Sequence, residues 1–312
     1  QQTYSSTFVK VSADSYMIQT VNEKLAVKST SFVPMYTKAY DNGLDYSSGG
    51  AGLAPNITIS STTASKASVP AISAPFTLHP AVYMVDDYYQ IIFTTDSLGM
   101  GWVTVGGKKY YHQTNGLMDW KTKYHIVYVP RVALDSARGY VINFQSMTDR
   151  AAYNPVHGDT VSRTYPFKPL ADKKEPVFYT VSDCSSCLNE AKAAAAYKNF
   201  DALFIGGDLT YDGATENKIK VILDTASALT SGTKPVVYTR GNLEIRGNKS
   251  ELLQKMAPSS KTGKSYFTIE QADFFGIVLD TGEDKVDSNS EYGSTVDYQN
   301  FRKEQTEWLK QV

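Results

Sequence analysis

Apolar and polar residues alternate in short runs through the first part of the chain. The runs "SSTFVKVSA" and "SYMIQTV" are separated by polar stretches, and no apolar period of 3.6 residues accompanies them. Alternation with a period of two is typical of β-strands. Residues 1–77 are therefore predicted to form a Ser/Thr-rich β segment or an extended arm.

Strand-like runs then follow one another at regular intervals between residues 78 and 170. They are rich in β-branched and aromatic residues and are separated by Asp, Gly, Asn and Ser: "AVYMVDD", "YQIIFTTD", "GWVTVGG", "KKYYHQT", "YHIVYVP" and "GYVINFQS". This pattern predicts a β-sandwich over residues 78–170. The stretch "YPFKPLADKKEP" is interpreted as the linker that closes it.

The rhythm changes from about residue 171, where strands begin to alternate with helices. "PVFYTVSD", "DALFIGGD" and "KPVVYTRGN" are predicted strands, and "LNEAKAAAAYKNF" and "ATENKIKVILDTASALT" are predicted helices between them. Such alternation indicates a mostly parallel, covered sheet. "KSYFTIEQADFFGIVLDTG" predicts two strands joined by a tight turn, and "YQNFRKEQTEWLKQV" an amphipathic helix. A helix so placed normally leads into another strand, so the α/β domain of residues 171–312 is expected to be incomplete at its C-terminus.

Composition excludes some classes of function. The chain of 312 residues is 42% hydrophobic and carries a net charge of −1 with no basic run, so a nucleic-acid partner is not expected. No apolar stretch is long enough to cross a bilayer. The sequence begins "QQTYSS", with no apolar signal region, which is interpreted as a processed terminus or the boundary of an expressed fragment.

Two N-x-S/T tripeptides, at Asn56 and Asn248, are candidate N-glycosylation sites. Glycans are added only in a secretory pathway, so these sites favour a secreted or cell-surface glycoprotein. The two cysteines, Cys184 and Cys187, are too few for a disulfide framework.

Polar side chains follow each of the three predicted parallel strands. They are Asp183, Asp208 with Tyr211, and Asn242. Ligands of open α/β sheets bind at the carboxyl ends of the strands, and hard oxygen donors there suit a metal pair and a phosphate. The alternative interpretation is that each is an ordinary turn or helix-capping residue.

These motifs resemble the calcineurin-like metallophosphoesterases, and among them the purple acid phosphatase branch, from about residue 176 to 312. "GGDLTYDG" has the family's G-D-x-x-Y form, which implies a metal-bridging role for Asp208 and a metal ligand in Tyr211. The resemblance likewise implies metal ligands in Asp183 of "VSDCSS" and Asn242 of "RGNLE". It also implies that residues 78–170 are similar to the fibronectin-III-like domain that often precedes such catalytic domains.

The chain departs from this family in the motif that contacts the phosphate. The family's third motif, G-N-H-D/E, requires a histidine that contacts phosphate, and Leu243 stands there. All four histidines (His79, His112, His125 and His157) precede residue 171, so the α/β part has no imidazole to offer. Asp183, Asp208, Tyr211 and Asn242 are therefore expected to be a vestigial metal set, with no catalytic residue and no cofactor. The alternative is a dinuclear Fe, Zn or Mn centre.

The pair Cys184–Cys187 lies at the position of the first metal motif, between a predicted strand and a predicted helix. The favoured interpretation is a short disulfide that fixes this loop. A redox-active C-x-x-C pair and a two-cysteine metal site are the alternatives.

Two functional hypotheses follow. The first is a secreted pseudoenzyme that uses the fold as a structural or binding scaffold, with a protein partner or further copies of the chain covering an open sheet edge by β-augmentation. The second is an active metal-dependent phosphoesterase whose remaining histidine ligands lie in a segment absent from this sequence. Carbohydrate is a further possible partner through the pairs Tyr88–Tyr89 and Tyr110–Tyr111, which ordinary strand patterning explains equally well.

Overall fold

The computed structural model describes residues 4–12, 15–22, 27–34, 68–271 and 274–312. The chain divides into two compact units, Gln1–Thr63 and Ala64–Val312. In the first unit, β1 (Tyr4–Ser12), β2 (Ser15–Asn22) and β3 (Val27–Pro34) form an antiparallel sheet in the order β1-β2-β3. Three strands thus form in the region where the sequence alternates. Asn56 lies outside the described residues.

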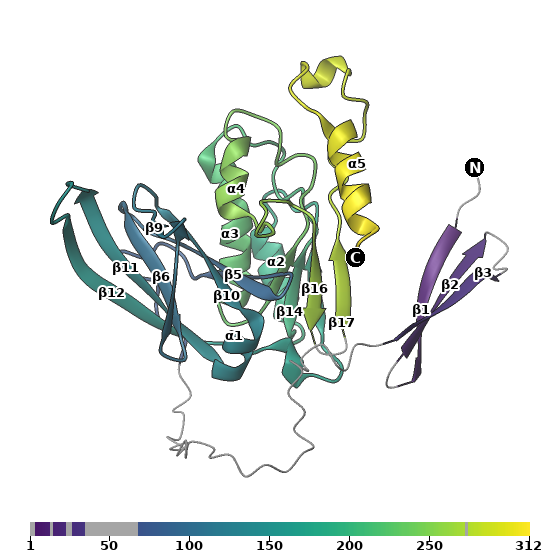
Figure 1. Ribbon diagram of the computed structural model, residues 1–312, viewed down its shortest axis with the longest axis horizontal. Helices are drawn as coiled ribbons and strands as arrows, with labels where there is room; N and C mark the ends of the chain where they lie inside the picture. Colours follow the sequence, from purple (N-terminus) through teal and green to yellow (C-terminus); the bar gives the residue numbers. More distant parts are fainter. Residues whose placement is uncertain (1–3, 13–14, 23–26, 35–67, 272–273) are drawn as a thin grey trace, which may run out of the picture. The chain divides into compact units, whose positions relative to one another are not determined.

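The second unit is built on a six-stranded sheet with the order β10-β5-β4-β15-β14-β13 (Figure 1). Its antiparallel half consists of β4 (Ala81–Val85), β5 (Tyr88–Thr94) and β10 (Tyr124–Pro130). Its parallel half consists of β13 (Phe178–Val181), β14 (Ala202–Ile205) and β15 (Val236–Tyr238). The helices α2 (Leu188–Ala195) and α3 (Glu216–Thr230) connect the parallel strands, as their alternation with strands predicted.

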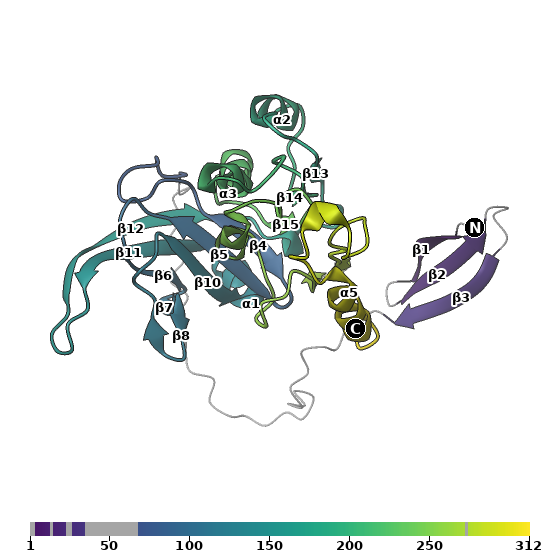
Figure 2. The ribbon, with the colours of Figure 1, turned by 90° about the horizontal axis from the view of Figure 1, so that it is seen from above.

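Helix α3 covers the sheet with one apolar face. Its buried apolar residues Ile219, Ile222, Leu223 and Ala226 recur at the spacing of one helix face, and this face packs on the sheet. Figure 2 shows α2 and α3 on one side of the six-stranded sheet. Thr215 caps α3 by accepting a hydrogen bond from the Lys218 amide, and Ser231 ends it in a left-handed conformation.

A second sheet, of four antiparallel strands, completes the β-rich part of this unit. Its order is β12-β11-β6-β7, and its strands are β6 (Gly99–Val105), β7 (Lys108–Tyr111), β11 (Gly139–Asp149) and β12 (Val156–Pro166). His125 of β10 packs between Phe93 and Phe144, with ring centroids 4.8 and 5.4 Å away, so aromatic and imidazole rings fill the space between the sheets. The remaining short elements are β8 (Gln113–Thr114), β9 (Leu117–Met118), α1 (Arg131–Ala137), η1 (Leu170–Asp172), η2 (Ser250–Leu252), α4 (Leu253–Met256) and η3 (Ser290–Tyr292).

The boundary predicted at residue 170 is not a domain boundary. Strand β4 pairs with β15 in parallel, with Tyr83 opposite Val236, so residues 78–170 and 171–312 share one sheet rather than forming a separate sandwich and a separate α/β domain. Every residue of β4 and of β15 is buried. Strands that are apolar on both faces need cover on both faces and therefore lie inside a sheet. The predicted linker is also part of the core, since Phe167 is buried with its ring 5.0 Å from that of Tyr89.

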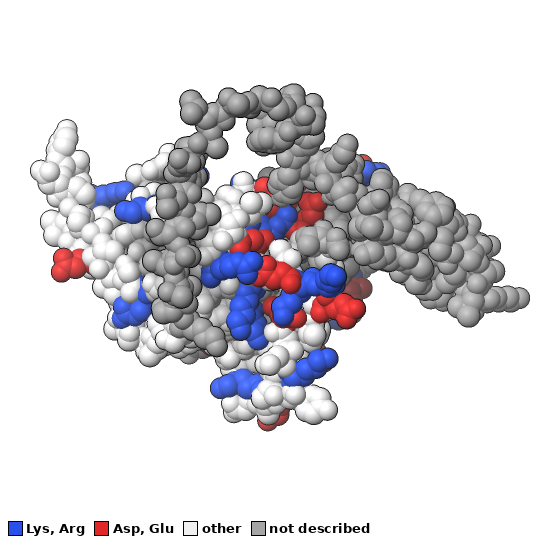
Figure 3. Space-filling view, turned by 90° about the horizontal axis from the view of Figure 1, so that it is seen from below, with Lys and Arg blue, Asp and Glu red and all other residues white. Residues whose placement is uncertain are grey.

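A hairpin and a final helix lie beside this sheet. The hairpin consists of β16 (Phe267–Gln271) and β17 (Phe274–Val278), and α5 (Tyr298–Leu309) follows it. Among the described residues, no helix is both long enough and apolar enough to cross a membrane. On the face shown in Figure 3, basic and acidic side chains are interspersed, in keeping with the net charge of −1.

Candidate functional site

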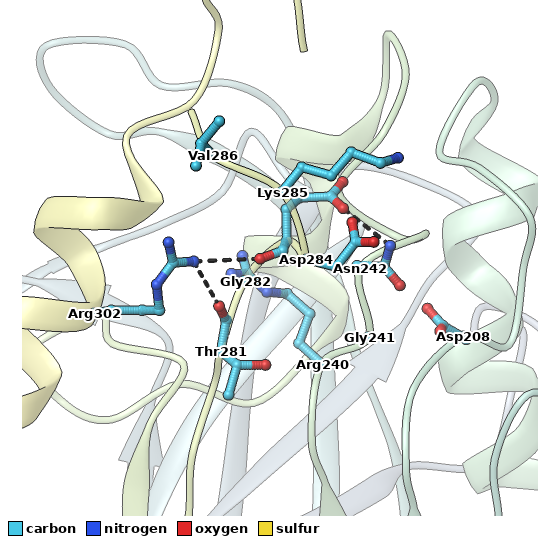
Figure 4. Close-up of a pocket in the computed structure, with 11 residues that line it drawn as sticks. Asp208, Arg240, Gly241, Asn242, Thr281, Gly282, Asp284, Lys285, Val286 and Arg302 are labelled. Carbon is cyan, nitrogen blue, oxygen red and sulfur yellow. Dashed lines mark hydrogen bonds between the residues drawn. The ribbon is translucent and has the colours of Figure 1, made fainter. Parts of the chain in front are cut away.

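A pocket of about 690 Å³ opens at the carboxyl ends of the parallel strands (Figure 4). Asp208 reaches it from the loop after β14, and the loop after β15 supplies the next side of it. The remaining side comes from the stretch after β17 and from α5. The complete lining is Asp208, Arg240, Gly241, Asn242, Thr281, Gly282, Glu283, Asp284, Lys285, Val286 and Arg302. Two of the four predicted metal ligands, Asp208 and Asn242, therefore share this pocket.

The loops after β14 and β15 touch through two glycines. A Cβ atom on Gly207 would lie 2.2 Å from the backbone nitrogen of Gly241, and a Cβ atom on Gly241 would lie 2.1 Å from the carboxylate of Asp208. Both distances are far below van der Waals contact. The glycines thus bring Asp208, which has a left-handed φ of 54°, against the Arg240–Asn242 backbone.

Leu243 contributes its backbone to the site. Its amide nitrogen donates a hydrogen bond to Oδ1 of Asp208 at 2.9 Å. The half-buried apolar side chain has no group that can bind metal or donate a proton. At position 243, where the resemblance requires an imidazole, it is therefore the backbone amide that binds a carboxylate oxygen of Asp208.

Asn242 is tied to a buried carboxylate that the sequence did not single out. Its Nδ2 donates to Oε2 of Glu283 at 3.0 Å, and Arg246 donates to both oxygens of Glu283, from Nε and Nη2, each at 2.6 Å. Burial alone would raise the pKa of Glu283, whose side chain is 1% exposed. The hydrogen bonds and charge of Arg246 and the Asn242 amide outweigh it and lower that pKa below its ordinary value.

This arginine also reaches the next turn of the chain. Nη1 of Arg246 donates to Glu291 at 2.7 Å, and the Tyr292 hydroxyl lies 3.3 Å from Glu283. The group Asn242, Glu283, Arg246, Glu291 and Tyr292, called here the Glu283 network, connects the loop after β15 to the stretch after β17. It fixes the amide of Asn242 on one side of the pocket.

Two arginines connect α5 to the pocket, Arg302 of α5 itself and Arg240 of the loop after β15. Arg240 pairs with the buried Asp280 at 2.7 Å, and its guanidinium lies 5.8 Å from the ring centroids of both Tyr298 and Phe301. Arg302 donates from Nη1 to the backbone oxygens of Thr281 and Glu283, at 3.0 and 3.3 Å (Figure 4). These contacts hold the 281–283 backbone against α5.

A buried carboxylate follows the pocket residue Asn242 two positions along the chain. Glu244 is fully buried, and its Oε1 accepts a hydrogen bond from the Leu209 amide at 3.0 Å. Oε2 has no hydrogen-bond partner, and neither do the buried hydroxyls of Tyr83 and Tyr238 or Nε of Arg240. Burial raises the pKa of Glu244, and the charge of Asp208 adds to that rise.

Asp183 and Tyr211 do not join Asp208 and Asn242. Neither lines the pocket, and the Tyr211 side chain is 70% exposed. Asp183 is exposed in a turn with a φ of 49°, where its amide donates to the Gly207 carbonyl at 3.0 Å. Both residues therefore occupy turn positions after their strands.

Cys184 and Cys187 form a disulfide, with their Cα atoms 5.2 Å apart. Cys184 is buried, and Cys187 immediately precedes the first residue of α2. The bridge closes the turn that follows Asp183. No thiol of the chain is free in this structure.

The four predicted ligands do not all line one pocket. Asp208 and Asn242 line it, and each makes a hydrogen bond to another part of the protein. In the part of the chain that the structure describes, no group of three or more His, Cys, Asp or Glu side chains is placed to hold a metal ion. Of the carboxylates that line the pocket, Asp208 accepts from the Leu243 amide, Glu283 pairs with Arg246, and Asp284 accepts from the Tyr292 hydroxyl.

The other candidate residues fall outside the pocket. Asn248 is exposed in the turn that precedes η2. Tyr89 is fully buried and donates to Asp135 at 2.7 Å, so Tyr88 and Tyr89 do not form an exposed aromatic face. Tyr88 and Tyr89 are neighbours in β5, and the side chains of neighbouring strand residues point to opposite faces of the sheet.

No protein-family model matches the sequence, and no curated protein does either. Among solved structures, the chain is similar to a purple acid phosphatase isolated from yellow lupin (Lupinus luteus) seeds, with a TM-score of 0.43 and 13% identity. The match covers 71% of this chain and 49% of that one, so the chain spans about half the length of the plant protein.

Proposed function

We propose that this chain is a secreted, non-catalytic protein that keeps a metallophosphoesterase-like fold as a scaffold and a polar binding pocket. One observation carries the proposal. Only two of the four candidate ligands, Asp208 and Asn242, line the pocket, and the residue that follows Asn242 is the apolar Leu243.

The contacts of Glu283 oppose its recruitment by a metal ion. Hydrogen bonds that involve a charged group contribute about 1.5–3 kcal/mol each. A metal ion that bound Glu283 would have to compete with the bidentate Arg246 pair and with the Asn242 amide. In place of a cation, the Glu283 network already neutralises its carboxylates with Arg246 and Lys285.

The alternative function is a metal-dependent phosphoesterase with further histidine ligands from a segment beyond this sequence. It is favoured by the fact that Asp208 and Asn242 line one pocket at the carboxyl ends of parallel strands. Leu243 is evidence against this alternative, because a segment elsewhere in the protein cannot place a histidine side chain at position 243.

Hydrolysis of 4-nitrophenyl phosphate tests the proposal. The wild-type chain and Asp208→Asn are assayed side by side with added Zn²⁺, Mn²⁺ or Fe²⁺, so that a contaminating phosphatase affects both equally. We expect the same background rate from both. A wild-type rate that falls at least about tenfold in Asp208→Asn would overturn the proposal, since removal of a functional metal ligand has effects of that size.

The secreted location rests on the candidate glycosylation sites. Asn248 is exposed, as an acceptor must be, and Asn56 is the second candidate. Protein isolated from its natural source should lose mass on treatment with an N-glycosidase. An unchanged mass would remove this support.

A further inference from the structure

We propose that the outer edge of β17 is a self-association surface, where a second copy of this chain pairs its own β17 antiparallel about a twofold axis through Ile277. This goes beyond the proposed scaffold function by naming the surface and the partner. It does not depend on whether the chain hydrolyses phosphate, and its test uses a separate readout.

Strand β17 has one paired edge and one open edge. Among the residues that the structure describes, it pairs only with β16, with Thr268 opposite Ile277 and Ile269 opposite Gly276. Figure 1 shows β17 as the outer strand of this hairpin. Unpaired strand edges offer a row of backbone donors and acceptors to any matching strand.

The backbone groups of Ile277 point toward that open edge. The Thr268 carbonyl accepts from the Asp86 amide at 2.7 Å, and the Thr268 amide donates to the Asp86 side chain at 3.1 Å. Thr268 therefore directs its backbone groups away from β17, and the Thr268–Ile277 pair is a non-hydrogen-bonded one. In an antiparallel ladder the N–H and C=O of Ile277 then face outward, where a second strand can bind them.

The side chains of the same edge form an apolar strip. Phe275, Ile277 and Leu279 lie on one face of the hairpin and are 56%, 42% and 41% exposed. The opposite face is used internally, since the Phe274 ring lies 5.7 Å from that of Phe178. Strand β17 contains no charged residue and no proline, which are the usual devices that prevent strand pairing.

The strip is complementary to itself in one register. With the twofold axis at Ile277, each Phe275 lies opposite Leu279 of the other copy, and the two Ile277 residues face each other. All three exposed apolar side chains then pack against those of the other copy across the new strand pair, with Thr268 and Glu270 at the polar margin. No two carboxylates are brought together, because Asp280 is buried and paired with Arg240 at 2.7 Å. An apolar centre with a polar margin is the usual anatomy of a protein interface.

This interface is small, so we expect a weak, concentration-dependent dimer. Light scattering of the full chain up to about 0.5 mM should show the mass rising toward that of two chains, since interfaces of this size bind weakly. Ile277→Lys brings two ammonium groups together and should keep the chain monomeric. Val132→Lys is the matched control, because Val132 is 54% exposed on α1 and is not part of the strip of Phe275, Ile277 and Leu279, so this variant should behave as wild type.

Cross-linking tests the register. A short bis-maleimide should join Ile277→Cys chains to each other. It should not join Phe275→Cys chains, but should join a mixture of Phe275→Cys and Leu279→Cys chains. Cys184 and Cys187 are disulfide-bonded and do not react.

Either of two results would overturn the proposal: a monomer at all concentrations without the Ile277→Cys cross-link, or a dimer that Ile277→Lys leaves intact. Phosphatase assays on the same samples report separately on the proposed function. Circular dichroism confirms that each variant is folded.

Discussion

The amide of Leu243 holds the carboxylate of Asp208 at 2.9 Å, at the point where the loops after β14 and β15 meet. The donor is a main-chain group, so any residue at position 243 except proline can provide it. The leucine side chain adds packing but no chemistry. One carboxylate oxygen of Asp208 thereby connects the two loops.

Restoring the missing side chain should not restore activity. Leu243→His retains the amide that binds Asp208, and it moves neither Asn242 from Glu283 nor the exposed Tyr211 into the pocket. We expect hydrolysis of 4-nitrophenyl phosphate with Zn²⁺, Mn²⁺ or Fe²⁺ to stay at the wild-type background. Leu243→Gln controls for a polar side chain of similar size. A gain of activity specific to histidine would mean that the other ligands are already in place.

The Glu283 network should stabilise the fold around the pocket. Arg246→Ala leaves the buried carboxylate of Glu283 without its bidentate partner. Removing one partner of a buried pair costs about 3–5 kcal/mol, and because Arg246 is 31% exposed we expect a smaller loss of unfolding free energy, about 2 kcal/mol. Urea denaturation measures it.

Lys310→Ala is the matched control for Arg246→Ala. Its partner Glu307 and Lys310 itself are 67% and 64% exposed, and loss of such a pair should change the unfolding free energy by less than about 0.5 kcal/mol. Equal effects of the two variants would show that the network contributes no more than a surface ion pair.

Close contact between the two loops should make Gly241 intolerant of substitution. In Gly241→Ala the new methyl group would lie 2.1 Å from Asp208, and relief of this clash is expected to cost about 3 kcal/mol of unfolding free energy. Gly263→Ala has open space around it and a φ of 78°, so only left-handed strain of about 1 kcal/mol is expected. Thermal or urea unfolding compares the two. A Gly241→Ala variant no less stable than Gly263→Ala would refute the contact.

Stability should fall in acid because His125 is buried as a neutral ring. Burial, with a smaller contribution from the nearby His112, lowers its pKa from 6.5 to about 3. A histidine with a lowered pKa binds fewer protons in the folded state than in the unfolded state, so unfolding free energy is lost as pH falls from 6.5 toward 3. The contribution of His125 at pH 4.5 amounts to at most about 3 kcal/mol relative to pH 7.

His125→Gln removes this contribution and should flatten the pH dependence of unfolding free energy between pH 7 and 4.5. The difference in slope from wild type isolates His125 from His79, His112 and the carboxylates, which titrate in both proteins. His157→Gln, at an exposed position, serves as the control. Parallel slopes for wild type and His125→Gln would contradict the account.

Local pattern predicted the elements of residues 171–312 well. The helix face of Ile219, Ile222 and Ala226 is visible in the sequence, and so are the apolar strands before Asp183, Asp208 and Asn242. The shared sheet was missed because "AVYMV" was interpreted as one strand among alternating neighbours. Its apolar residues do not alternate, and this continuous run is the signal of a strand buried on both faces.

The site could be predicted only in part. Motif spacing led to Asp208, Asn242 and the odd Leu243. Arg246 and Glu283 were missed because they are far apart in the sequence, and an arginine in a polar loop has no pattern of its own. Such a pair is defined by tertiary contact, in which the stretch after β17 returns to the loop after β15.

The metal content per chain, measured on protein purified from its natural source without chelators, tests the central claim most directly. The account predicts no Fe, Zn or Mn in stoichiometric amount, because Leu243 stands where an imidazole is required and neither Asp183 nor Tyr211 lines the pocket with Asp208 and Asn242. About two such ions per chain, as a two-metal site requires, would contradict it and would mean that other residues complete a working centre.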